Sequence, residues 1–431
     1  MQVLRHNEPG FARKIDRLCA ASSLFNSKIE ASTRSIVEHV GLKGDAALIE
    51  FSERFDGVNL TVGTLRVGDA EIQTAAKSVD SKLKAAIRFA HRNVRDFHQR
   101  GLRKGWSGQN AQGARVGEKY DAFDRVGIYI PGGTAPLMST ALMTVTLAKV
   151  AGCREIVVCT PCDKDREINP GLLHAARIAG ATEIYRVGGA HAIAALALGT
   201  KTIAPVQKIF GPGNAYVVAA KRQLVGRVSI DLLPGPSELL VLADASANPA
   251  YAAADILAQA EHGSGFERCW LISTSSKIIA AVKKEIEKQL CGQSRRKYIQ
   301  KALNKHCWLI QVKSLAESIS LANRLAPEHC ELMLKNHKEV AKKIVTAGAL
   351  FLGNDSPTVT GDYVAGPSHT LPTGGAGASF QGLTVDMFQR RTSVVQYSKA
   401  ALKKSISVIE QFAEIEGLYA HGRSASIRLN P

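Results

Sequence analysis

The sequence has few aromatic residues and no cysteine framework. Phe, Trp and Tyr make up only 6% of its 431 residues, whereas glycine and alanine are frequent and charged residues make up 22%. This composition is typical of a globular α/β protein and argues against a disordered or fibrous chain. The eight cysteines are scattered, so we expect small buried side chains and no disulfides. Cys159 and Cys162 form a C-x-x-C pair, but no second pair stands at a spacing that suits zinc.

Long apolar runs and runs of like charge are also missing. No window reaches the length of a membrane span, and the N-terminal residues MQVLRHNEPGFARKIDRL have neither the apolar core nor the cleavage site of a secretion signal. We therefore expect a cytoplasmic protein that binds no membrane. The net charge is +17, but the basic residues are spread along amphipathic segments such as residues 81–106. Solvated helix faces are favoured over a nucleic-acid-binding surface, which is the weaker alternative.

The order of apolar patterns predicts an α/β fold. Residues 27–41 and 44–57 repeat apolar side chains three and four positions apart and end at glycine, which predicts a helical N-terminal layer. From residue 124, a short apolar strand, a glycine turn and an apolar helix recur, and a second unit of this type follows Ser237. Strands that alternate with helices favour mostly parallel sheets with helices on both faces. Residues 337–348 are among the expected helices.

Three glycine-rich turns follow expected strands. They are YIPGG, RVGGA and IFGPGN, at residues 129–133, 186–190 and 209–214. Ligands of parallel sheets bind at the carboxyl ends of strands, and glycine lets backbone amides approach a phosphate at a helix N-terminus. None of the turns matches G-x-G-x-x-G, so they indicate a nucleotide or anion site without specifying which.

Polar side chains that suit a metal ion lie in three separate segments. They are Gln259 and His262, Asp362 and His369, and Glu416 and His421. Gln259 and His262 stand three residues apart on one helical face, so both can reach a common point. The second segment lies in an irregular stretch, residues 354–382, whose length is typical of functional loops. Two imidazoles, a carboxylate and an amide oxygen suit zinc or a similar ion, but no standard zinc spacing links them, so structural roles are the alternative.

The stretch LAPEHCEL, residues 325–332, places Glu328 beside His329 directly after Pro327. Proline ends the preceding helix, and the two side chains lie at the entry to a strand, where neighbours face opposite sides unless the backbone bends. One interpretation is a hydrogen-bonded histidine beside a surface glutamate. The other is an acid/base pair next to the ligand edge of the sheet, which would suit hydride chemistry on an alcohol.

Eight blocks of the sequence resemble one known family. IYIPGGTAPL, VGGAHAIAALA, FGPGNAYV, IDLLPGPSELLVLAD, AQAEH, LAPEHCEL, GDYVAGPSHTLPT and EGLYAH follow one another in the order and at the spacings of histidinol dehydrogenases. The likeness runs from about Gly44 to the C-terminus. It implies oxidation of L-histidinol to L-histidine with two NAD+, through a bound aldehyde, as the last step of histidine biosynthesis. It also implies a homodimer with one zinc ion per subunit.

The resemblance implies a role for each matching residue. Glu328 and His329 match the catalytic acid/base pair. The residues that match the zinc ligands are Gln259, His262, Asp362 and His421, the last of which reaches the metal of the other subunit. Substrate contacts are matched by Ser237, Gln259, His262, His329, Asp362, His369, Glu416 and His421. NAD contacts are matched by Tyr129, His191 and Asn214.

Two Rossmann-like parallel-sheet domains follow from the same resemblance. The first is expected to be discontinuous, with residues 24–126 and 236–383, and to hold the zinc and catalytic residues. The second, residues 127–235, would lie on the NAD side. Residues 1–23 and 384–431 are expected to be small helical segments, with a swapped C-terminal tail that completes the site of the partner subunit.

The sequence departs from the family pattern at a few positions. His191 stands where the family has glutamine, so its length, tautomer and charge put the cofactor contact in question. Gly263, Ser368 and Pro234 also differ from the usual residues, but none of them is a matched ligand or proton carrier. The nearest alternative is a relative that oxidises another polar primary alcohol, such as a sulfopropanediol, on the same zinc scaffold.

Overall fold

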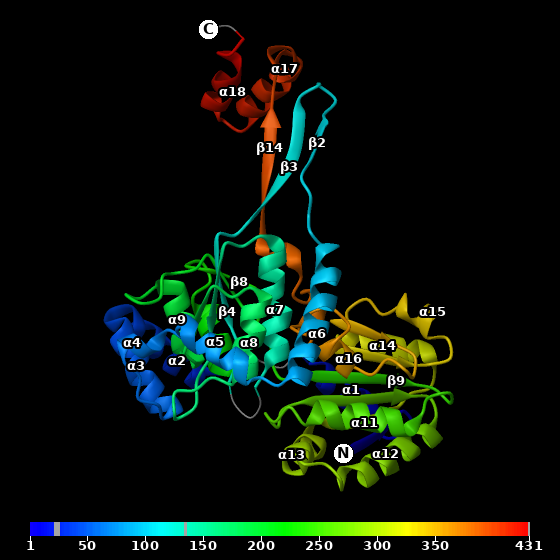
Figure 1. Ribbon diagram of the computed structural model, residues 1–431. Coiled ribbons are helices and arrows are strands. Elements are labelled where there is room, and N and C mark those ends of the chain that lie inside the picture. The colour runs from blue at the N-terminus through cyan, green and yellow to red at the C-terminus, as the bar shows by residue number, and fades with distance from the viewer. Residues whose placement is uncertain (21–25, 133–135, 430–431) are drawn as a thin grey trace.

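The computed structural model describes residues 1–20, 26–132 and 136–429. The expected domain boundary at residues 23 and 24 and the last glycine of the YIPGG turn, Gly133, lie outside these ranges. Two parallel sheets, each covered by helices, lie beside one another, and a long arm projects from the junction (Figure 1). The predicted α/β class is thereby confirmed. Within the described ranges, no helix is long and apolar enough to cross a membrane.

The first sheet has five parallel strands in the order β6-β5-β4-β7-β8. Their bounds are Glu183–Tyr185, Glu155–Cys159, Arg125–Tyr129, Lys208–Phe210 and Ser229–Ile230. Numbered along the chain, this is the Rossmann order 3-2-1-4-5, which reverses direction between β4 and β7. One face is covered by α7 (Met138–Ala151) and α8 (Pro170–Ala179), the other by α9 (Gly189–Leu198) and α10 (Ala215–Gln223).

The N-terminal helices form an outer layer on this same five-stranded unit. They are α2 (Ser27–Lys43), α3 (Asp45–Phe51), a π-helical turn (Ser52–Asp56), α4 (Val62–Leu65), α5 (Asp69–Ser78) and α6 (Ser81–Gln99). Val40 and Leu48 are buried against α9, whereas Ile72 and Val94 are buried with α7 and α8. The predicted helical layer is present. Its apolar faces pack on the five-stranded unit. Residues 24–126 had been expected to form one domain with residues 236–383 of the six-stranded unit.

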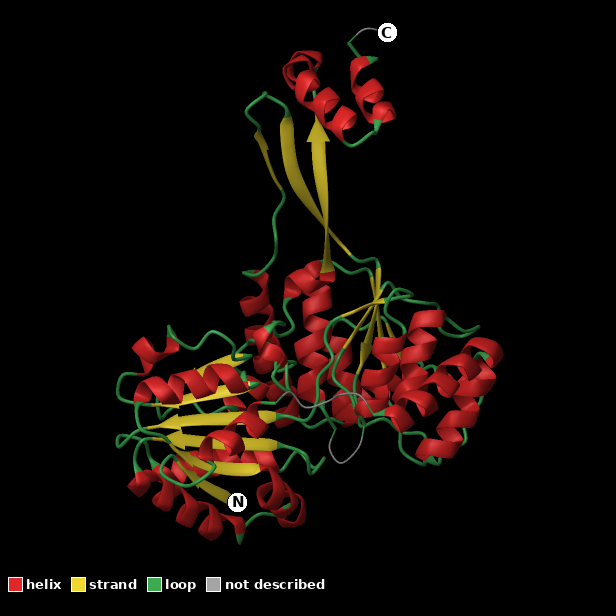
Figure 2. Cartoon of the chain, turned by 180° about the vertical axis from the view of Figure 1, so that it is seen from behind, coloured by secondary structure: helices red, strands yellow, loops and turns green. Residues whose placement is uncertain are grey.

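The second sheet has six parallel strands in the order β1-β11-β10-β9-β12-β13. Their bounds are Gln2–Arg5, Cys307–Gln311, Arg268–Ser273, Glu238–Ala243, His329–Met333 and Ala349–Leu352. Without β1, the order is again 3-2-1-4-5, with its reversal between β9 and β12. Figure 2 shows the strands of both sheets between layers of helices.

Helices cover both faces of the six-stranded sheet. One face holds α11 (Pro249–Ala260), α12 (Ser276–Leu290) and α13 (Arg296–His306), the other α1 (Phe11–Cys19), α14 (Leu315–Leu325) and α15 (His337–Ala341). α11 begins after a capping residue, because the Asn248 side chain accepts a hydrogen bond from the Ala250 N–H at 2.9 Å. α15 ends at Ala341, earlier than the predicted 337–348.

The N-terminal segment packs on the six-stranded sheet, and its expected role in subunit exchange stays a prediction. β1 extends the six-stranded sheet beside β11, and Ile15 of α1 is buried in the core beneath α14. Four residues give too short a pattern to reveal a strand from the sequence. Residues 1–20 therefore belong to the six-stranded unit of their own chain.

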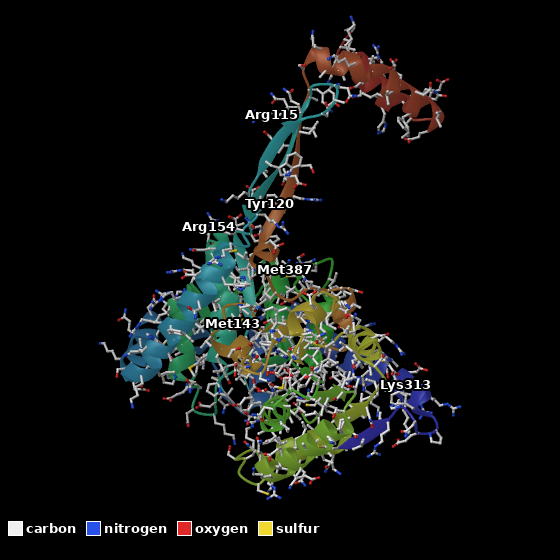
Figure 3. All side chains as sticks on the ribbon, turned by 90° about the vertical axis from the view of Figure 1, so that its right-hand side faces the viewer. Arg115, Tyr120, Met143, Arg154, Lys313 and Met387 are labelled. Carbon is white, nitrogen blue, oxygen red and sulfur yellow. The ribbon has the colours of Figure 1, made fainter. Side chains whose placement is uncertain are left out.

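The arm consists of a three-stranded antiparallel ribbon that carries the tail. β2 (Trp106–Gln109), β3 (Arg115–Ala122) and β14 (Gln389–Gln396) form the ribbon, and α17 (Lys399–Ile415) and α18 (Tyr419–Ser426) lie at its far end (Figure 1). Figure 3 shows Arg115 near the tip, Tyr120 midway and Met387 at the root. The root is anchored, because fully buried Phe388 stacks on Phe210 with ring centroids 3.8 Å apart.

Candidate active site

Glu328 and His329 lie at the amino end of β12, beside the amino end of β9. The chain reaches this point from α14, whose last turn is closed by Ala326 in a left-handed conformation with φ 45°. Both side chains are buried, with 5% and 4% of their surfaces exposed. The expected position at the entry to this strand is confirmed, and it lies at the amino edge of the six-stranded sheet. The interpretation as a surface glutamate is excluded.

The backbone of one residue, Glu238, orients both side chains. The Glu238 N–H donates to Glu328 Oε2 at 2.8 Å, and the Glu238 carbonyl accepts a hydrogen bond from His329 Nδ1 at 3.0 Å. A carbonyl oxygen only accepts, so Nδ1 carries the hydrogen and the lone pair of a neutral ring lies on Nε2. That atom is 3.8 Å from Asp362 Oδ1. Nε2 of His329 is therefore the atom that can take up a proton.

Burial favours the neutral forms of both groups. It raises the pKa of Glu328 well above its usual range, and the nearby Glu238 and Asp362 carboxylates add to this effect. Hydrogen bonds from the Glu238 N–H and the Ser237 side chain oppose it. Burial also lowers the pKa of His329, against the attraction of Asp362. Burial therefore favours the protonated form of Glu328 and the neutral form of His329.

The irregular stretch 354–382 folds over the pair and links it to the other sheet. It contains α16 (Val359–Tyr363), which carries Asp362. His369 Nδ1 donates to the Asp362 carbonyl at 3.2 Å, and His369 Nε2 is 3.0 Å from Thr140 Oγ1 in the first turn of α7. α7 starts beyond the carboxyl end of β4. The carboxyl edge of the five-stranded sheet therefore meets the amino edge of the six-stranded sheet.

A cavity of about 320 Å³ opens beside these residues. Its lining includes His329, Phe351, Thr360 and His369. The structure thus brings together Ser237, Glu328, His329, Asp362 and His369, and the charge of His262 also acts on the pKa of His329. These residues were separate candidates in the sequence, and two of them, His329 and His369, line the cavity.

Gln259 and His262 are suited to hold a metal ion. His262 Nδ1 donates to the Gln259 carbonyl at 3.0 Å, which leaves His262 Nε2 as a lone-pair donor. Gln259 is 3% exposed, and its Nε2 has no hydrogen-bond partner among the described residues, while its Oε1 is the atom that could bind a metal ion. With Asp362, these donors fit zinc. In the described ranges no three His, Cys, Asp or Glu side chains cluster tightly enough for a cation, so a further ligand is needed.

Glu416 and His421 are not brought to this site within the chain. Glu416 directly follows α17 and His421 lies in α18, and both are exposed. These helices stand at the far end of the arm, away from β12 and α16 (Figure 1).

Tyr129, His191 and Asn214 gather at the carboxyl edge of the five-stranded sheet. Tyr129 ends β4, and its hydroxyl accepts a hydrogen bond from the Gly189 N–H at 3.0 Å. Asn214 follows β7 and caps α10, because its Oδ1 accepts hydrogen bonds from two backbone N–H groups. β4 and β7 flank the point where the strand order reverses, which is where parallel sheets bind dinucleotides.

His191 is buried in α9 with only 1% of its surface exposed. Its ring lies 5.7 Å from that of Phe51 and 6.1 Å from that of Phe55, and neither ring nitrogen has a hydrogen-bond partner among the described residues. Burial lowers the pKa of His191 to about 3. The imidazole is therefore neutral near pH 7, and a polar ligand group would satisfy its nitrogens.

Two residues of the site escaped the sequence analysis. Glu238 acts through its backbone, and its own carboxyl is fully buried beside Arg268 at 3.2 Å, with burial raising its pKa to about 7. Its place directly after Ser237 was the available signal. Thr140 bonds His369 only because the two units pack together, and nothing in its local sequence indicates that.

This arrangement defines a class: an enzyme with two Rossmann-like units and an acid/base pair between them, suited to dinucleotide-dependent oxidation and reduction. A family model described as histidinol dehydrogenase matches residues 20–429. Histidinol dehydrogenases of Synechococcus sp. and Geobacillus kaustophilus are 45% identical over 399 residues and 44% over 423. These matches cover 93% and 96% of this chain, and 92% and 99% of the relatives. The chain belongs to the histidinol dehydrogenase family.

A solved structure agrees with this assignment. The crystal structure of histidinol dehydrogenase from Elizabethkingia anophelis superimposes with a TM-score of 0.94 at 36% identity, covering 100% of this chain and 98% of that chain. The whole fold described above, including the arm, is thus shared with a solved member of the family.

Because burial raises the pKa of Glu328, replacing it by an uncharged residue should stabilise the fold, and the gain should be larger at higher pH. As pH rises above the usual glutamate range, the unfolded chain loses this proton more readily than the folded chain, so ionisation destabilises the fold. Glu328→Gln in metal-free protein should therefore raise Tm by about 2–4 °C at pH 8, with the gain shrinking toward pH 5. Glu339→Gln, on the exposed part of α15, is the control and should change little. A gain that is independent of pH would contradict the buried-acid assignment.

Proposed function

We propose that this chain oxidises L-histidinol to L-histidine with two NAD+ at the cavity beside Glu328 and His329. The observation that carries the proposal is the backbone of Glu238, whose N–H and carbonyl orient Glu328 and His329 where the two Rossmann-like units meet. Membership of the histidinol dehydrogenase family supplies the substrate class. The resulting reaction is a four-electron oxidation of a primary alcohol in one site.

The two proton carriers have different roles in this proposal. His329 Nε2 takes the proton of the alcohol, because Nδ1 is held by the Glu238 carbonyl. Glu328 activates the water that adds to the aldehyde. Its raised pKa makes the carboxylate a stronger base toward water than an exposed glutamate would be. Ser237, which hydrogen-bonds Glu328, orients it toward the substrate.

Gln259, His262 and Asp362 of one chain would hold a zinc ion together with His421 of the partner subunit. When bound, zinc would supply an anchor for the imidazole and amine of the substrate. The buried amide of Gln259, whose Oε1 can serve as a ligand, and the tautomer of His262, which leaves the lone pair on Nε2, support this assignment. His369 of the same chain and Glu416 of the partner subunit would contact the substrate. The Glu416 carboxylate would favour a substrate with a cationic group over an uncharged analogue.

Tyr129, His191 and Asn214 would bind NAD at the point where the strand order of the five-stranded sheet reverses. NAD+ accepts the hydride in each oxidation step. Tyr129 and Asn214 stand on the two sides of that point, and His191 offers two buried ring nitrogens that lack partners among the described residues. The junction of the two units places this edge next to the acid/base pair.

A homodimer with exchanged tails would complete each site. α17 and α18 expose a set of large apolar side chains at the end of the arm, which favours a covering partner. They are Val408, Phe412, Ile415, Leu418 and Tyr419. Glu416 and His421 lie in the same tail, so its docking on a second subunit would supply both missing contacts.

The substrate and the division of labour are tested together by product stoichiometry. The wild-type protein should form two NADH for each L-histidinol and none with a sulfopropanediol. Glu328→Gln should still perform the first oxidation in single-turnover kinetics but slow the second, so that histidinal accumulates. Equal loss of both steps in this variant would contradict the separate role of Glu328. Turnover of the sulfonated alcohol alone would overturn the proposed substrate.

The exchanged tail is tested by mixing two inactive variants. His421→Ala lacks the proposed partner ligand, and His329→Gln lacks the base. A mixed dimer should contain one intact site, which combines the His329 of one chain with the His421 of the other. Refolding equal amounts together should restore about a quarter of the wild-type activity, because half of the dimers are mixed and each has one competent site. If each tail serves its own chain, the mixture stays inactive.

His191 is tested by restoring the residue that the family usually has. His191→Gln replaces a neutral imidazole by a flexible amide donor and acceptor, and NAD+ binding measured by calorimetry should become tighter or stay equal. Because the imidazole titrates near pH 3, wild-type affinity should show no histidine-dependent change between pH 6 and pH 8. His306→Gln, on α13 of the other unit, is the control. A clearly weaker complex would remove His191 from the cofactor site.

A further inference from the structure

A fully buried ion pair lies next to the expected dinucleotide turn. Lys221 lies in α10 and Asp231 follows β8, and the side chains of both are 0% exposed. The Lys221 ammonium donates a hydrogen bond to Asp231 Oδ1. It also donates to the Gly211 carbonyl at 2.9 Å and to the Leu232 carbonyl at 3.2 Å. All three hydrogens of the ammonium have acceptors, so Lys221 has no donor left for a ligand.

The pair holds the turn after β7 by both of its backbone groups. Asp231 Oδ2 accepts a hydrogen bond from the Gly211 N–H at 2.7 Å, while Lys221 holds the Gly211 carbonyl. Gly211 has φ +109°, and a Cβ there would lie 2.1 Å from the Tyr129 carbonyl oxygen at the end of β4. The turn is thus pressed against β4 across the point where the strand order reverses, with no room for a side chain.

The other end of the same network leads to the acid/base pair. Residues 231–237 run directly from the five-stranded sheet to the six-stranded sheet. Leu232 is held by Lys221, Gly235 donates its N–H to Thr373 Oγ1, and Ser237 hydrogen-bonds Glu328. One buried ion pair therefore fixes both the cofactor-side turn and the start of the segment that reaches the acid.

Stability alone does not explain two charges in this position. Desolvation of a buried ion pair offsets its attraction, and packed apolar residues of the same volume are often as stabilising. What the pair supplies is a fixed geometry for three strand ends. We propose that Lys221 and Asp231 are positioning residues that hold the 211–214 turn and the 231–237 segment in register, so that NAD+ binds with its reactive end at the acid/base pair. This inference rests on the function proposed above.

The test compares two neutralised ion pairs in the same sheet. Lys221→Met with Asp231→Asn removes both charges at similar volume and leaves no buried charge unpaired. It should weaken NAD+ binding by roughly tenfold in calorimetry, because the site is no longer preorganised. The zinc content should stay unchanged, because Gln259, His262 and Asp362 lie outside the turn and the segment that the pair holds. The control is Arg125→Met with Glu183→Gln, a bidentate pair at 2.7 and 2.9 Å near the amino edge of the same sheet. Glu155, which also contacts Arg125, is 41% exposed and keeps its charge in water.

The control variant should lose thermal stability without losing NAD+ affinity. Equal NAD+ affinity in both double variants would overturn the positioning role and leave the pair a structural element. If the Lys221 and Asp231 double variant does not fold, Lys221→Arg replaces it, since a planar guanidinium keeps the charge but cannot reach all three acceptors. Folded Lys221→Arg protein with wild-type NAD+ affinity would equally overturn the proposal. If the wild-type protein itself binds no NAD+, the proposed function fails, which is a distinct result.

Discussion

The rest of the site depends on the backbone of one residue at the start of β9. The N–H and the carbonyl of Glu238 point to Glu328 and His329 on the neighbouring strand, and they fix the position of one and the tautomer of the other. A backbone group cannot change rotamer, so this control is as rigid as the parallel pairing of β9 with β12. The chemistry of the two side chains is thereby tied to the register of the sheet.

That constraint also explains where the two units meet. In a single Rossmann-like sheet, ligands bind at the carboxyl edge, yet the acid/base pair lies at the amino edge of its own sheet. The conflict disappears because the carboxyl edge of the other sheet faces it through the contacts of His369 with Asp362 and Thr140. One sheet therefore offers the edge suited to a dinucleotide, and the other offers proton carriers on a rigid strand end.

Local sequence patterns predicted which helices and strands form better than they predicted which of these elements pack together. The periodicity of residues 27–57 was sufficient for α2 and α3, because burial of one helix face is decided within a few residues. The partner of the N-terminal helices, the added strand β1 and the edge that holds Glu328 depend on long-range packing. The eight sequence blocks named the candidate residues, but the role of the Glu238 backbone leaves no trace in side-chain identity.

Burial gives these groups one common property. Burial favours the neutral form of Glu328, of His329 and of His191, so a ligand that brings its own charge or polar group changes the balance at each. A cationic ligand near Glu328 would offset the cost of its ionisation and lower its pKa, turning an acid into a base. In the proposed reaction, this couples the arrival of charged ligands to the step that needs a carboxylate. The order of proton transfers then follows from the order of binding, with no need for a second set of residues.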